Sequence, residues 1–491
     1  MDTTVLLSIR KDVSVAEETA DQLTLLAPFA SLSFTTLTLK QVTPALRAGL
    51  AALLDGGASQ DQLTASVLEA DGISGLYRLN FYLRKLFERS LLCHTVSVDG
   101  RPLATFSPLA DFGQPYRADA VDSTKTYVLS RFACCRREKD GMVLECPLGH
   151  AQVQLHTPEA VALVAELARP ATCDQLAAQH TELPATAITG IVNLLLNAQA
   201  LSEVDAEGKS AEEANSTLAQ WEFHDLLFHS RSRLGRHNNP FGKTYSFEEK
   251  IPPLPPVKPA MSDVIIPLFK PDIQALKEND IPFSRVLEER RSLRNYDDEQ
   301  PITDVQLGEF LYRTARVKEM YHDEKGGVTF RPYPGGGALQ SLEIYPVIDR
   351  CANIPSGLYH YDPLNHQLEK VSDRSVHVET MLQMAWHSIL ETSRPQILLV
   401  IASRFQRVQW KYSSIAYSVI LKDLGGLYQT MYLVATAMGL APCALGGGHS
   451  DLFAAAANLD YFAETSVGAL VLGSRAKGTD MLADHSRPSE H

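Results

Sequence analysis

Residues 420–439, ILKDLGGLYQTMYLVATAMG, decide the fold class of the carboxy-terminal half of this chain of 491 residues. Apolar side chains recur here at alternating steps of four and three, which places them on one face of a helix. They are Ile420, Leu424, Leu427, Met431, Val434 and Met438. Gly439 supplies a left-handed stop, and Pro442 prevents continuation. The stretch predicts a long core helix followed by an extended segment over residues 443–446.

Two runs of glycine flank this predicted helix. Gly446-Gly447-Gly448 follows it, and Pro334-Gly335-Gly336-Gly337 lies ahead of it. Glycine runs occur where a ligand approaches the main chain closely or where a positive φ is needed. Gly425-Gly426 inside the helix lowers helix propensity by about 1 kcal/mol per glycine relative to alanine, which suggests that another backbone or a flat ring needs the space. The alternatives are flexible surface loops and, for the helix, close packing against a neighbouring helix.

The segment Arg290-Arg291-Ser292-Leu293-Arg294 contains three guanidinium groups and a hydroxyl. A guanidinium presents a planar fork of donors that fits two phosphate oxygens, and a serine hydroxyl can add a further bond. The segment therefore predicts a phosphate site. A solvated basic turn is the alternative.

The composition restricts the class of protein. Lys and Arg total 45 against 58 Asp and Glu, and this net charge of −13 disfavours nucleic acid as a partner. The 7 cysteines are odd in number and irregularly spaced, as expected of free thiols in a reducing compartment. The opening residues lack a secretion signal, and the longest apolar stretch, near residues 397–402, is too short to span a bilayer. We expect a soluble, cytoplasmic protein with no membrane contact.

Four residues are candidate metal ligands: Cys134, Cys135, Cys146 and His150. Adjacent cysteines are an unusual ligand pair for zinc. The same stretch also fits a strand hairpin around Asp140-Gly141. We therefore predict no metal site.

The first 210 residues or so contain a repeat. In each half, strands precede a helix with a Thr-Pro start, Thr43-Pro44 in one and Thr157-Pro158 in the other, as N-cap and first helical residue. Asp61-Gln62-Leu63 is echoed by Asp174-Gln175-Leu176, and a longer apolar helix follows each. This order predicts two winged-helix-like modules. Winged helices also bind DNA, but neither set of helices shows a basic face.

These motifs together resemble the flavoprotein nitroreductase fold, over roughly residues 280–475. The resemblance rests on the arginine segment, both glycine runs and the helix from Asp423-Leu424-Gly425 to Gly439-Leu440. More narrowly, residues 357–363 (GLYHYDP) and 221–233 (WEFHDLLFHSRSR) resemble the branch that oxidises azolines in ribosomally made peptides. The chain is similar to the thiazoline oxidases of cyanobactin-type pathways.

The resemblance implies an α+β fold, in which a nitroreductase-like domain follows the two winged-helix-like modules, and an obligate homodimer that binds FMN at its interface. The residues expected to hold the phosphate and ribityl end are Arg290, Arg291, Ser292 and Arg294, with Arg475 as a further guanidinium. Pro334, Gly335, Gly336 and Gly337 are expected to line the flavin from the partner subunit, and Gly446, Gly447 and Gly448 to approach the ring near its N5. Family members often carry a serine in the first of these runs, so its absence here puts a side-chain contact in doubt.

Lys411-Tyr412 matches a Lys-Tyr pair that the azoline-oxidase branch carries at the start of the long helix. Oxidation of a thiazoline removes a proton from one ring carbon and a hydride from its neighbour, so the site needs a base. An adjacent ammonium favours the phenolate form of a tyrosine, and a buried lysine can lose its own proton. The resemblance therefore implies that Lys411 and Tyr412 are catalytic. Without it, an amphipathic helix start is the simpler interpretation.

The implied function is FMN-dependent oxidation of thiazolines to thiazoles in a precursor peptide. Dioxygen is the expected electron acceptor, since no nicotinamide motif is visible. The expected partners are the azoline-containing precursor peptide, a second copy of the chain and, as a candidate, a cyclodehydratase. One alternative is an NAD(P)H-dependent nitroreductase or dehydrogenase acting on small molecules. Another is a non-catalytic peptide-binding scaffold of a modifying complex.

The predicted organisation has four parts. Residues 1–120 and 121–212 form the first and second winged-helix-like modules, for which we expect peptide recognition by strand addition. Extension of the dimer interface is the alternative role. Residues 213–275 form a connecting segment with a stiff proline-rich spacer at 252–259, and residues 276–480 form the FMN-binding oxidase domain.

Overall fold

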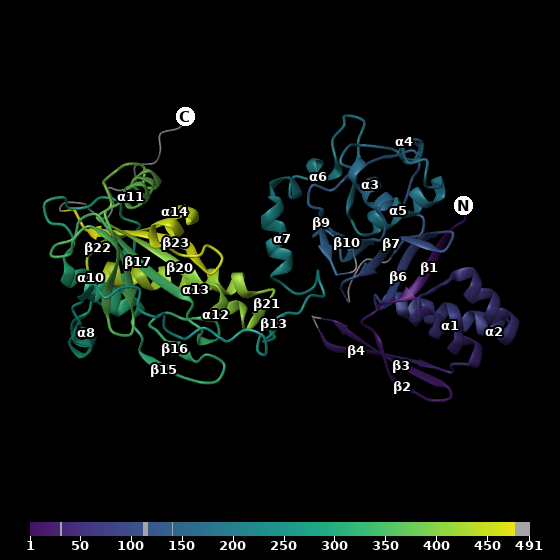
Figure 1. Cartoon of the computed structure of the whole chain (residues 1–491), viewed down its shortest axis with the longest axis horizontal. Coiled ribbons are helices and arrows are strands. Elements are labelled where there is room, and N and C mark those ends of the chain that lie inside the picture. The colour runs from purple at the N-terminus through teal and green to yellow at the C-terminus, as the bar shows by residue number, and fades with distance from the viewer. Residues whose placement is uncertain (30–31, 111–115, 140, 477–491) are drawn as a thin grey trace. The chain divides into compact units, whose positions relative to one another are not determined.

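The computed structural model describes residues 1–29, 32–110, 116–139 and 141–476 (Figure 1). The chain divides into two compact units, Met1–Phe241 and Gly242–His491. The division falls inside the stretch 213–275 that the sequence assigns to a connecting segment. The predicted end of the oxidase domain, residue 480, lies outside the described residues.

The amino-terminal unit is built on one antiparallel sheet in the order β5-β1-β6-β7-β11-β10-β9. Its strands are β1 (Thr3–Ile9), β5 (Ala58–Ser59), β6 (Leu92–Val98), β7 (Arg101–Pro108), β9 (Cys134–Glu138), β10 (Gly141–Glu145) and β11 (Ala151–Leu155). A second sheet contains β2 (Ser14–Glu18), β3 (Gln22–Phe29) and β4 (Leu32–Lys40), and β8 (Thr126–Leu129) pairs with β12 (Leu201–Val204). The two halves of the sequence repeat thus share one sheet, because β7 pairs with β11.

The helices of this unit follow the predicted repeat. They are α1 (Pro44–Leu54), α2 (Gln60–Glu88), α3 (Pro158–Glu166), α4 (Cys173–Gln179), α5 (Ala185–Asn197), α6 (Ala211–Ala214), η1 (Leu218–Gln220) and α7 (Phe223–Arg231). The Thr43 and Thr157 hydroxyls accept hydrogen bonds from the amides of Leu46 and Ala160, which confirms both Thr-Pro starts. Two predicted helices of the first half are merged into α2, which bends at Gly72, where φ is 65°.

The carboxy-terminal unit contains a mostly buried antiparallel sheet in the order β14-β19-β18-β17-β20-β23-β22. Its strands are β14 (Ile265–Pro267), β17 (Leu342–Ile348), β18 (Gly357–Asp362), β19 (Gln367–Asp373), β20 (Ile397–Arg404), β22 (Leu440–Leu445) and β23 (Glu464–Ser474). The helices are η2 (Gly336–Ala338), α8 (Ile273–Asn279), α9 (Phe283–Glu289), α10 (Asp304–Ala315), α11 (Val376–Ser388), α12 (Gln406–Gln409), α13 (Ala416–Ala437) and α14 (Ser450–Ala457). Two short ladders pair β13 (Gly242–Lys243) with β21 (Tyr412–Ser413) and β15 (Glu319–Tyr321) with β16 (Val328–Phe330).

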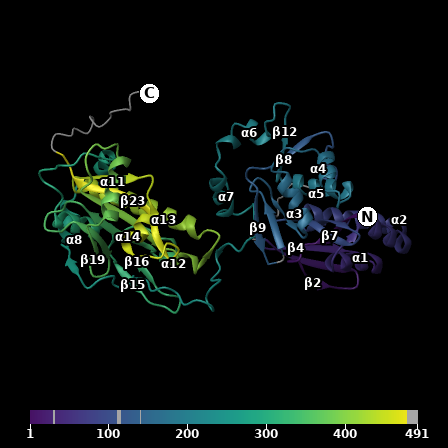
Figure 2. The same cartoon turned by 45° about the horizontal axis from the view of Figure 1, so that its top comes forward.

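Helices cover both faces of this sheet (Figure 2). Along β20, Ile397, Leu399 and Ile401 belong to the hydrophobic cluster of α10 and α13. Leu398 and Val400 belong to the cluster of α11 and α14. Because successive side chains of a strand point to opposite faces, a strand buried on both sides is a continuous apolar run, as β20 is. The mixture of helices with an antiparallel sheet confirms the α+β class.

Helix α13 confirms the prediction from residues 420–439. Ile420, Leu424, Leu427 and Met431 are buried in the core, while Val434 and Met438 are partly buried against it. Gly439 follows with a φ of 66°, a left-handed conformation that glycine adopts without strain. Strand β22 then runs extended into Gly446.

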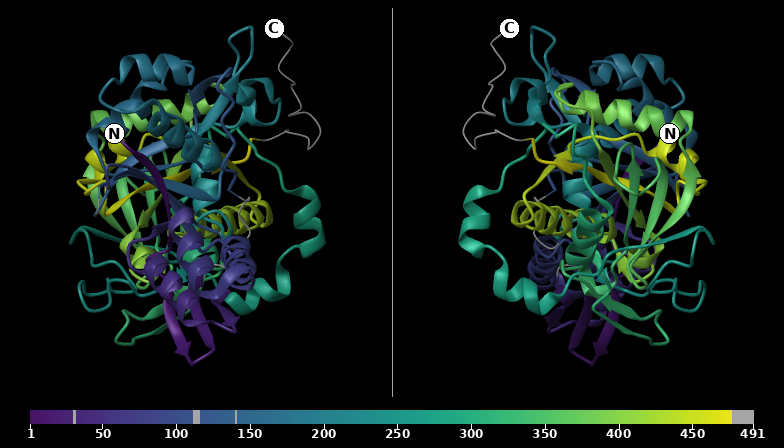
Figure 3. Two further views of the ribbon diagram at one scale, coloured as in Figure 1. Left: turned by 90° about the vertical axis from the view of Figure 1, so that its right-hand side faces the viewer. Right: turned by 90° about the vertical axis from the view of Figure 1, so that its left-hand side faces the viewer.

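Helices α8 and α9 carry mostly exposed side chains and stand out at the edge of the carboxy-terminal unit (Figure 3). No residue of α8 is buried, and Phe283 of α9 is 65% exposed.

The proline-rich stretch 252–259 is fastened along the carboxy-terminal unit. Buried cations hold its main chain: Arg404 Nη2 donates to the Pro255 carbonyl at 2.9 Å, and Arg407 Nη1 donates to the Leu254 carbonyl at 2.8 Å. At its end, Lys258 Nζ donates to Tyr345 Oη at 2.7 Å and to the Glu464 carboxylate at 2.5 Å. The stretch bends at Pro256 and Val257, so it is not extended throughout as predicted, and its contacts make it a strap on this unit instead of a free spacer.

The Lys258–Glu464 pair is expected to matter for stability, because its side chains are only 12% and 9% exposed. Lys258→Met leaves the Glu464 carboxylate buried without its cation, and should lower the free energy of unfolding of this unit by about 3 kcal/mol. Lys370→Met is the control, since it removes an ion pair whose Asp373 is 85% exposed; it should cost less than about 1 kcal/mol. Calorimetric unfolding measures both, and equal losses would contradict the structural role of Lys258.

Candidate functional site

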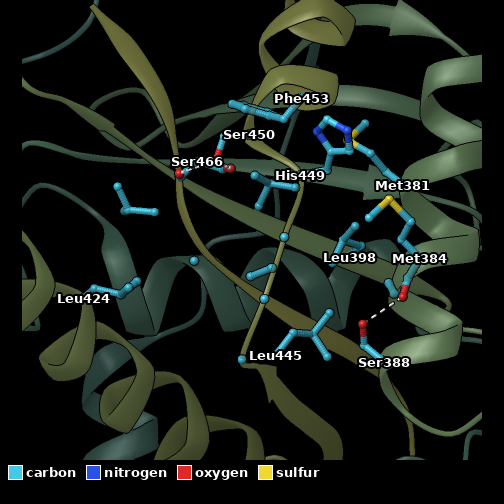
Figure 4. Close-up of a pocket in the computed structure, with 18 of the residues that line it drawn as sticks. Met381, Met384, Ser388, Leu398, Leu424, Leu445, His449, Ser450, Phe453 and Ser466 are labelled. Carbon is cyan, nitrogen blue, oxygen red and sulfur yellow. Dashed lines mark hydrogen bonds between the residues drawn. The ribbon is translucent and has the colours of Figure 1, made fainter. Parts of the chain in front are cut away.

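The carboxy-terminal unit contains a cavity of about 690 Å³ (Figure 4). This volume lies within the range of small-molecule and cofactor sites. Its walls are mainly apolar side chains and bare backbone, from Met381 and Met384 of α11, Leu398 and Val400 of β20, Tyr417, Leu424 and Tyr428 of α13, Gly446–Gly448, Ser450 and Phe453 of α14, and residues 466–469 of β23.

The glycines at 446–448 present bare main chain to this cavity. A Cβ atom added at any of the three would meet no other atom within 4 Å. The glycine at 468 differs, because a Cβ there would overlap the Tyr428 hydroxyl. That hydroxyl accepts from the Ala469 amide at 2.6 Å and donates to the Ala469 carbonyl at 3.0 Å. Gly446–Gly448 thus leave room for a ligand, whereas Gly468 makes room for α13.

The arginine segment 290–294 packs beside the strand that leads to Gly446. The Leu293 amide donates to the Pro442 carbonyl of β22 at 2.9 Å. Ser292 Oγ and the Tyr432 hydroxyl of α13 are hydrogen-bonded at 2.9 Å, and the Arg290 guanidinium lies 5.4 Å from the centre of the Tyr432 ring. The segment therefore lies next to both elements that form one end of the cavity wall, β22 and α13.

Arg291 and Arg475, two of the arginines predicted to hold the phosphate, differ from each other in their positions. Arg291 is exposed, and its Nη1 donates to the carbonyls of Glu288 and Arg290. Arg475 follows β23 and is brought beside the arginine segment by a backbone bridge to Tyr296. Arg475 thus lies close to the segment despite its distance in sequence, while Arg291 folds back on its own turn.

The other glycine run meets Lys411 and Tyr412. The Gly336 amide donates to both carboxylate oxygens of Asp423, at 2.9 and 3.0 Å. Gly337 has a φ of 62°, and a Cβ there would lie 2.6 Å from Tyr412 Oη and 2.9 Å from Lys411 Nζ. Both side chains therefore converge on Gly337, and only a glycine leaves room for them.

Lys411 and Tyr412 do not start the long helix. α12 ends at Gln409, Tyr412 begins β21, and α13 begins only at Ala416. The predicted position at a helix start is therefore wrong, as is the alternative of an amphipathic helix start at Trp410. Pairing with β13 makes this stretch extended, and a local sequence pattern cannot reveal such a distant partner.

The backbone around this pair includes strained residues. Four residues other than glycine near it have positive φ: Tyr245 (50°), Ala338 (56°), Gln340 (47°) and Ser414 (62°). Such conformations persist only where the surroundings over-determine them, and they cluster at functional sites.

Helix α13 separates the two groups of residues. Leu424 and Tyr428 line the cavity, whereas Asp423 binds Gly336, and Gly426 lies against Pro334, which a Cβ would meet at 3.1 Å. Lys411, Tyr412 and residues 334–337 are not among the residues that line the cavity. The chain therefore brings the arginine segment towards Gly446–Gly448, and Lys411 and Tyr412 to Gly337.

Sequence reasoning missed three polar groups at these sites. Asp423 lies in the motif of the long helix, and a carboxylate among the apolar residues of a core helix is a signal in itself. His449 and Ser450 follow the glycine run directly; His449 Nδ1 accepts from the Leu452 amide at 3.2 Å, and Ser466 Oγ donates to Ser450 Oγ at 3.0 Å (Figure 4). No spacing rule connects Ser466 to Ser450, because β23 brings it there.

The candidate metal ligands do not assemble. Among the described residues, no three or more His, Cys, Asp or Glu side chains gather as they would around an ion. Cys134 and Cys135 lie in β9, which pairs with β10; Asp140, around which the sequence predicts the hairpin, lies outside the described residues. Burial raises the pKa of the Cys146 thiol to about 11.

None of the helices in the described part of the chain combines the length and apolar character needed to cross a membrane.

Comparisons with known proteins identify the family. The model of the nitroreductase family matches residues 287–474. The "Putative nitroreductase MJ1384" of Methanocaldococcus jannaschii is 30% identical over 181 residues, which cover 37% of this chain and 84% of that protein. The chain belongs to the nitroreductase family. Its amino-terminal unit matches two further models, "ThcOx helix turn helix domain" over residues 1–115 and "Cyanobactin oxidase ThcOx" over residues 127–238. The chain thus combines the domains of a cyanobactin oxidase with a nitroreductase domain and is an oxidoreductase.

Two further relatives are processing proteins by name. The "Microcin B17-processing protein McbC" of Escherichia coli is 30% identical over 139 residues, 27% of this chain and 50% of that protein. The "Trifolitoxin-processing protein TfxB" of Rhizobium leguminosarum bv. trifolii is 28% identical over 166 residues, 33% of this chain and 44% of that protein. The match spans half of these two relatives or less.

Solved structures of low identity resemble the chain. A nitroreductase described as putative, from Ralstonia eutropha, is 22% identical with a TM-score of 0.34, covering 46% of this chain and 97% of its own. The E. coli microcin synthetase McbBCD complex with truncated pro-MccB17 bound contains a chain that is 21% identical, with a TM-score of 0.33, covering 51% of this chain and 91% of its own.

Asp423 should make the stability of the carboxy-terminal unit depend on pH. Burial raises the pKa of its carboxyl to about 6, against the lowering effects of the Gly336 amide and Lys422. The folded state then keeps a proton that the unfolded chain has released, so the stabilisation is complete at pH below about 4 and is lost as the pH rises through 6. The free energy of unfolding, relative to Asp423→Asn, should therefore fall between pH 4 and pH 7 in denaturant titrations. A difference that stays constant or rises would contradict this; the exposed Asp373→Asn controls for loss of a carboxylate.

Proposed function

We propose that the protein oxidises thiazolines to thiazoles in a ribosomally made precursor peptide, with FMN as cofactor. The observation that carries this proposal is the convergence of Lys411 Nζ and Tyr412 Oη on Gly337 within a nitroreductase domain. An ammonium and a phenol directed at one point form an acid–base pair, which an enzyme that only transfers hydride to a nitro group does not require. The cyanobactin oxidase match and the two processing proteins support the same substrate class.

The residues present fit FMN. A flat ring needs a wall without side chains, and Gly446–Gly448 provide one on a cavity of about 690 Å³. A phosphate needs cations, and Arg290 and Arg294 flank Tyr432 and the strand that leads to the glycines, with Arg475 nearby. Ser292 adds a hydroxyl beside Tyr432. Arg291, whose Nη1 donates to the carbonyls of Glu288 and Arg290, is the weakest member of this set.

A second copy of the chain completes the site in this proposal. Pro334 to Gly337, with Lys411 and Tyr412, lie apart from the residues that line the cavity of their own chain. In the arrangement that the nitroreductase resemblance implies, the partner supplies them. Phe283 and Leu287 on α9, which are 65% and 44% exposed, are apolar side chains that such a homodimer would bury.

The residues have distinct roles in the reaction. FMN bound here would supply the acceptor for the hydride that leaves one carbon of the thiazoline ring. Tyr412, as the phenolate, takes the proton from the neighbouring carbon, and the Lys411 ammonium beside it stabilises that phenolate. Asp423 holds the Gly336 amide, and so fixes the loop on which the two side chains converge. The ring loses two hydrogens in all, and dioxygen taking up two hydrogens as hydrogen peroxide balances the reaction.

The amino-terminal unit has the role of peptide recognition in this proposal. Its helix-turn-helix match and its sheet with edges at β5 and β9 suit the addition of an extended leader segment as a further strand. A cyclodehydratase, which makes azolines, is the enzyme class that must supply this substrate. The alternative is a nitroreductase of small molecules, which the similarity to MJ1384 favours.

The test is aerobic incubation of the FMN-loaded protein with a thiazoline-containing peptide, with and without its leader. Mass spectrometry should show the loss of two hydrogens per ring, faster when the leader is present. Turnover of nitroaromatics with NAD(P)H, and none of the peptide, would support the alternative instead.

Lys411→Ala and Tyr412→Phe should each lower kcat for the thiazoline by about 100-fold or more, because each removes a member of the acid–base pair. Visible absorbance should show that both variants keep FMN. The exposed Lys318→Ala and Tyr461→Phe serve as matched controls and should retain activity. Undiminished oxidation by both variants with FMN bound would show that the proton-transfer assignment is wrong.

The arginines should differ in their effect on FMN affinity. Arg290→Ala and Arg294→Ala each remove a charge-assisted phosphate contact of about 1.5–3 kcal/mol, so the Kd for FMN should rise at least about tenfold. Arg291→Ala should raise it less, since Arg291 points back to its own turn. Fluorescence titration of the flavin-free protein measures the Kd for FMN of all three variants. A Kd that rises as much in Arg291→Ala as in the other two variants would contradict the weaker role of Arg291.

A further inference from the structure

The segment at 242–246 runs beside Lys411 and Tyr412. We propose that it positions these two residues for proton transfer and that Thr244 is its key residue. This inference rests on the proposed function, because the proposed function makes Lys411 and Tyr412 the residues of proton transfer. The inference adds to that site the segment 242–246, which lies far from both residues in sequence and carries no motif.

The main chains of the two segments are paired. Gly242 is opposite Ser413 and Lys243 is opposite Tyr412 in the β13–β21 ladder. Beyond the ladder, the Lys411 carbonyl accepts two further hydrogen bonds, from the Thr244 amide at 3.0 Å and the Tyr245 amide at 3.2 Å. The backbone of Lys411 to Ser413 is therefore held at each residue by the segment at 242–246.

Three hydroxyls close the end of this ladder. Thr244 Oγ1 lies 2.6 Å from Ser413 Oγ and 2.9 Å from Ser246 Oγ, and the two serine oxygens are 3.2 Å apart. Each hydroxyl can donate to one neighbour and accept from the other, so the three satisfy one another. Thr244 is the member that combines this contact with the backbone bond to Lys411.

The next residue, Tyr245, is held in a strained conformation. Its φ is 50°, which costs on the order of 1 kcal/mol or more for a residue other than glycine. Its ring packs edge-on against Trp410, with the centroids 5.5 Å apart, and Lys325 Nζ lies 4.2 Å from its centre. Trp410 in turn donates from Nε1 to the Ile251 carbonyl at 2.7 Å. Contacts on both sides thus keep the strained turn in place.

The register of this ladder decides where the Tyr412 side chain points. Successive side chains of a strand point to opposite faces, so a shift by one residue would turn Tyr412 away from Gly337. The space at Gly337 is narrow, with Tyr412 Oη and Lys411 Nζ at 2.6 and 2.9 Å from the position of an added Cβ. A ladder of two residue pairs adds little stability by itself. Its effect is therefore on the position of Tyr412 and Lys411.

Kinetics test the inference through Thr244→Val, which removes the hydroxyl at nearly constant volume, and Thr244→Ser, which keeps it. Thr244→Val should lower kcat about tenfold and shift its pH profile, with KM and FMN content within about twofold of the wild type, because a displaced base transfers the proton less well. Thr244→Ser should restore most of the loss. Thr380→Val is the matched control, since that exposed hydroxyl donates to the Val376 carbonyl of its own helix. Wild-type kinetics in Thr244→Val would overturn the positioning role. So would a variant in which kcat falls, KM rises and the FMN content falls together, because that result indicates general damage to the site.

A second measurement does not depend on turnover. Fluorotyrosine placed at position 412 reports the surroundings of that ring by fluorine NMR. In Thr244→Val, and also in Ser413→Ala, its resonance should shift or broaden, while Thr244→Ser and Thr380→Val leave it unchanged. An identical resonance in all variants would refute the inference. If the wild type fails to oxidise a thiazoline, the proposed function fails, and this resonance still decides whether Thr244 positions Tyr412.

Discussion

The burial of α13 against the central sheet fixes both candidate sites. Ile420, Leu427 and Met431 are fully buried, and they hold the helix in one orientation about its axis. Leu424 and Tyr428 are thereby directed at the cavity beside Gly446–Gly448, and Asp423 at the Gly336 amide. A rotation of α13 would disturb both sites at once, so the apolar face of one helix determines the chemistry on two sides of it.

The second constraint is the attachment of residues 242–258 to the carboxy-terminal unit. Arg404 and Arg407 donate to main-chain carbonyls of this stretch, and its first residues pair with β21. Since Gly242 directly follows the amino-terminal unit in the chain, the connection between the units begins beside the proposed base. In the proposed function, the chain that leaves the peptide-recognition unit and the residues that move the proton are thus neighbours.

Local features were predictable from the sequence, and long-range pairings were not. α13, its end at Gly439 and the caps at Thr43 and Thr157 follow from side chains within a few residues of one another. The helix-start position expected for Lys411 failed, because pairing with Lys243 and Thr244, more than 160 residues earlier, makes this stretch extended. Likewise the contact between Gly337 and Tyr412 needs the folded chain, although both residues were singled out separately. The prolines predict an extended stretch, but it bends at Pro256 and Val257, and the buried cations that hold it lie in β20 and α12.

In the proposed function, the carboxy-terminal unit holds FMN between two copies of the chain. The most direct measurement is the flavin content and mass of the purified protein, from visible absorbance combined with light scattering on a sizing column. We expect about one FMN per chain in a particle of twice the mass of the chain, as a cofactor bound at a dimer interface requires. A colourless monomer that takes up no FMN when the flavin is added would contradict the account.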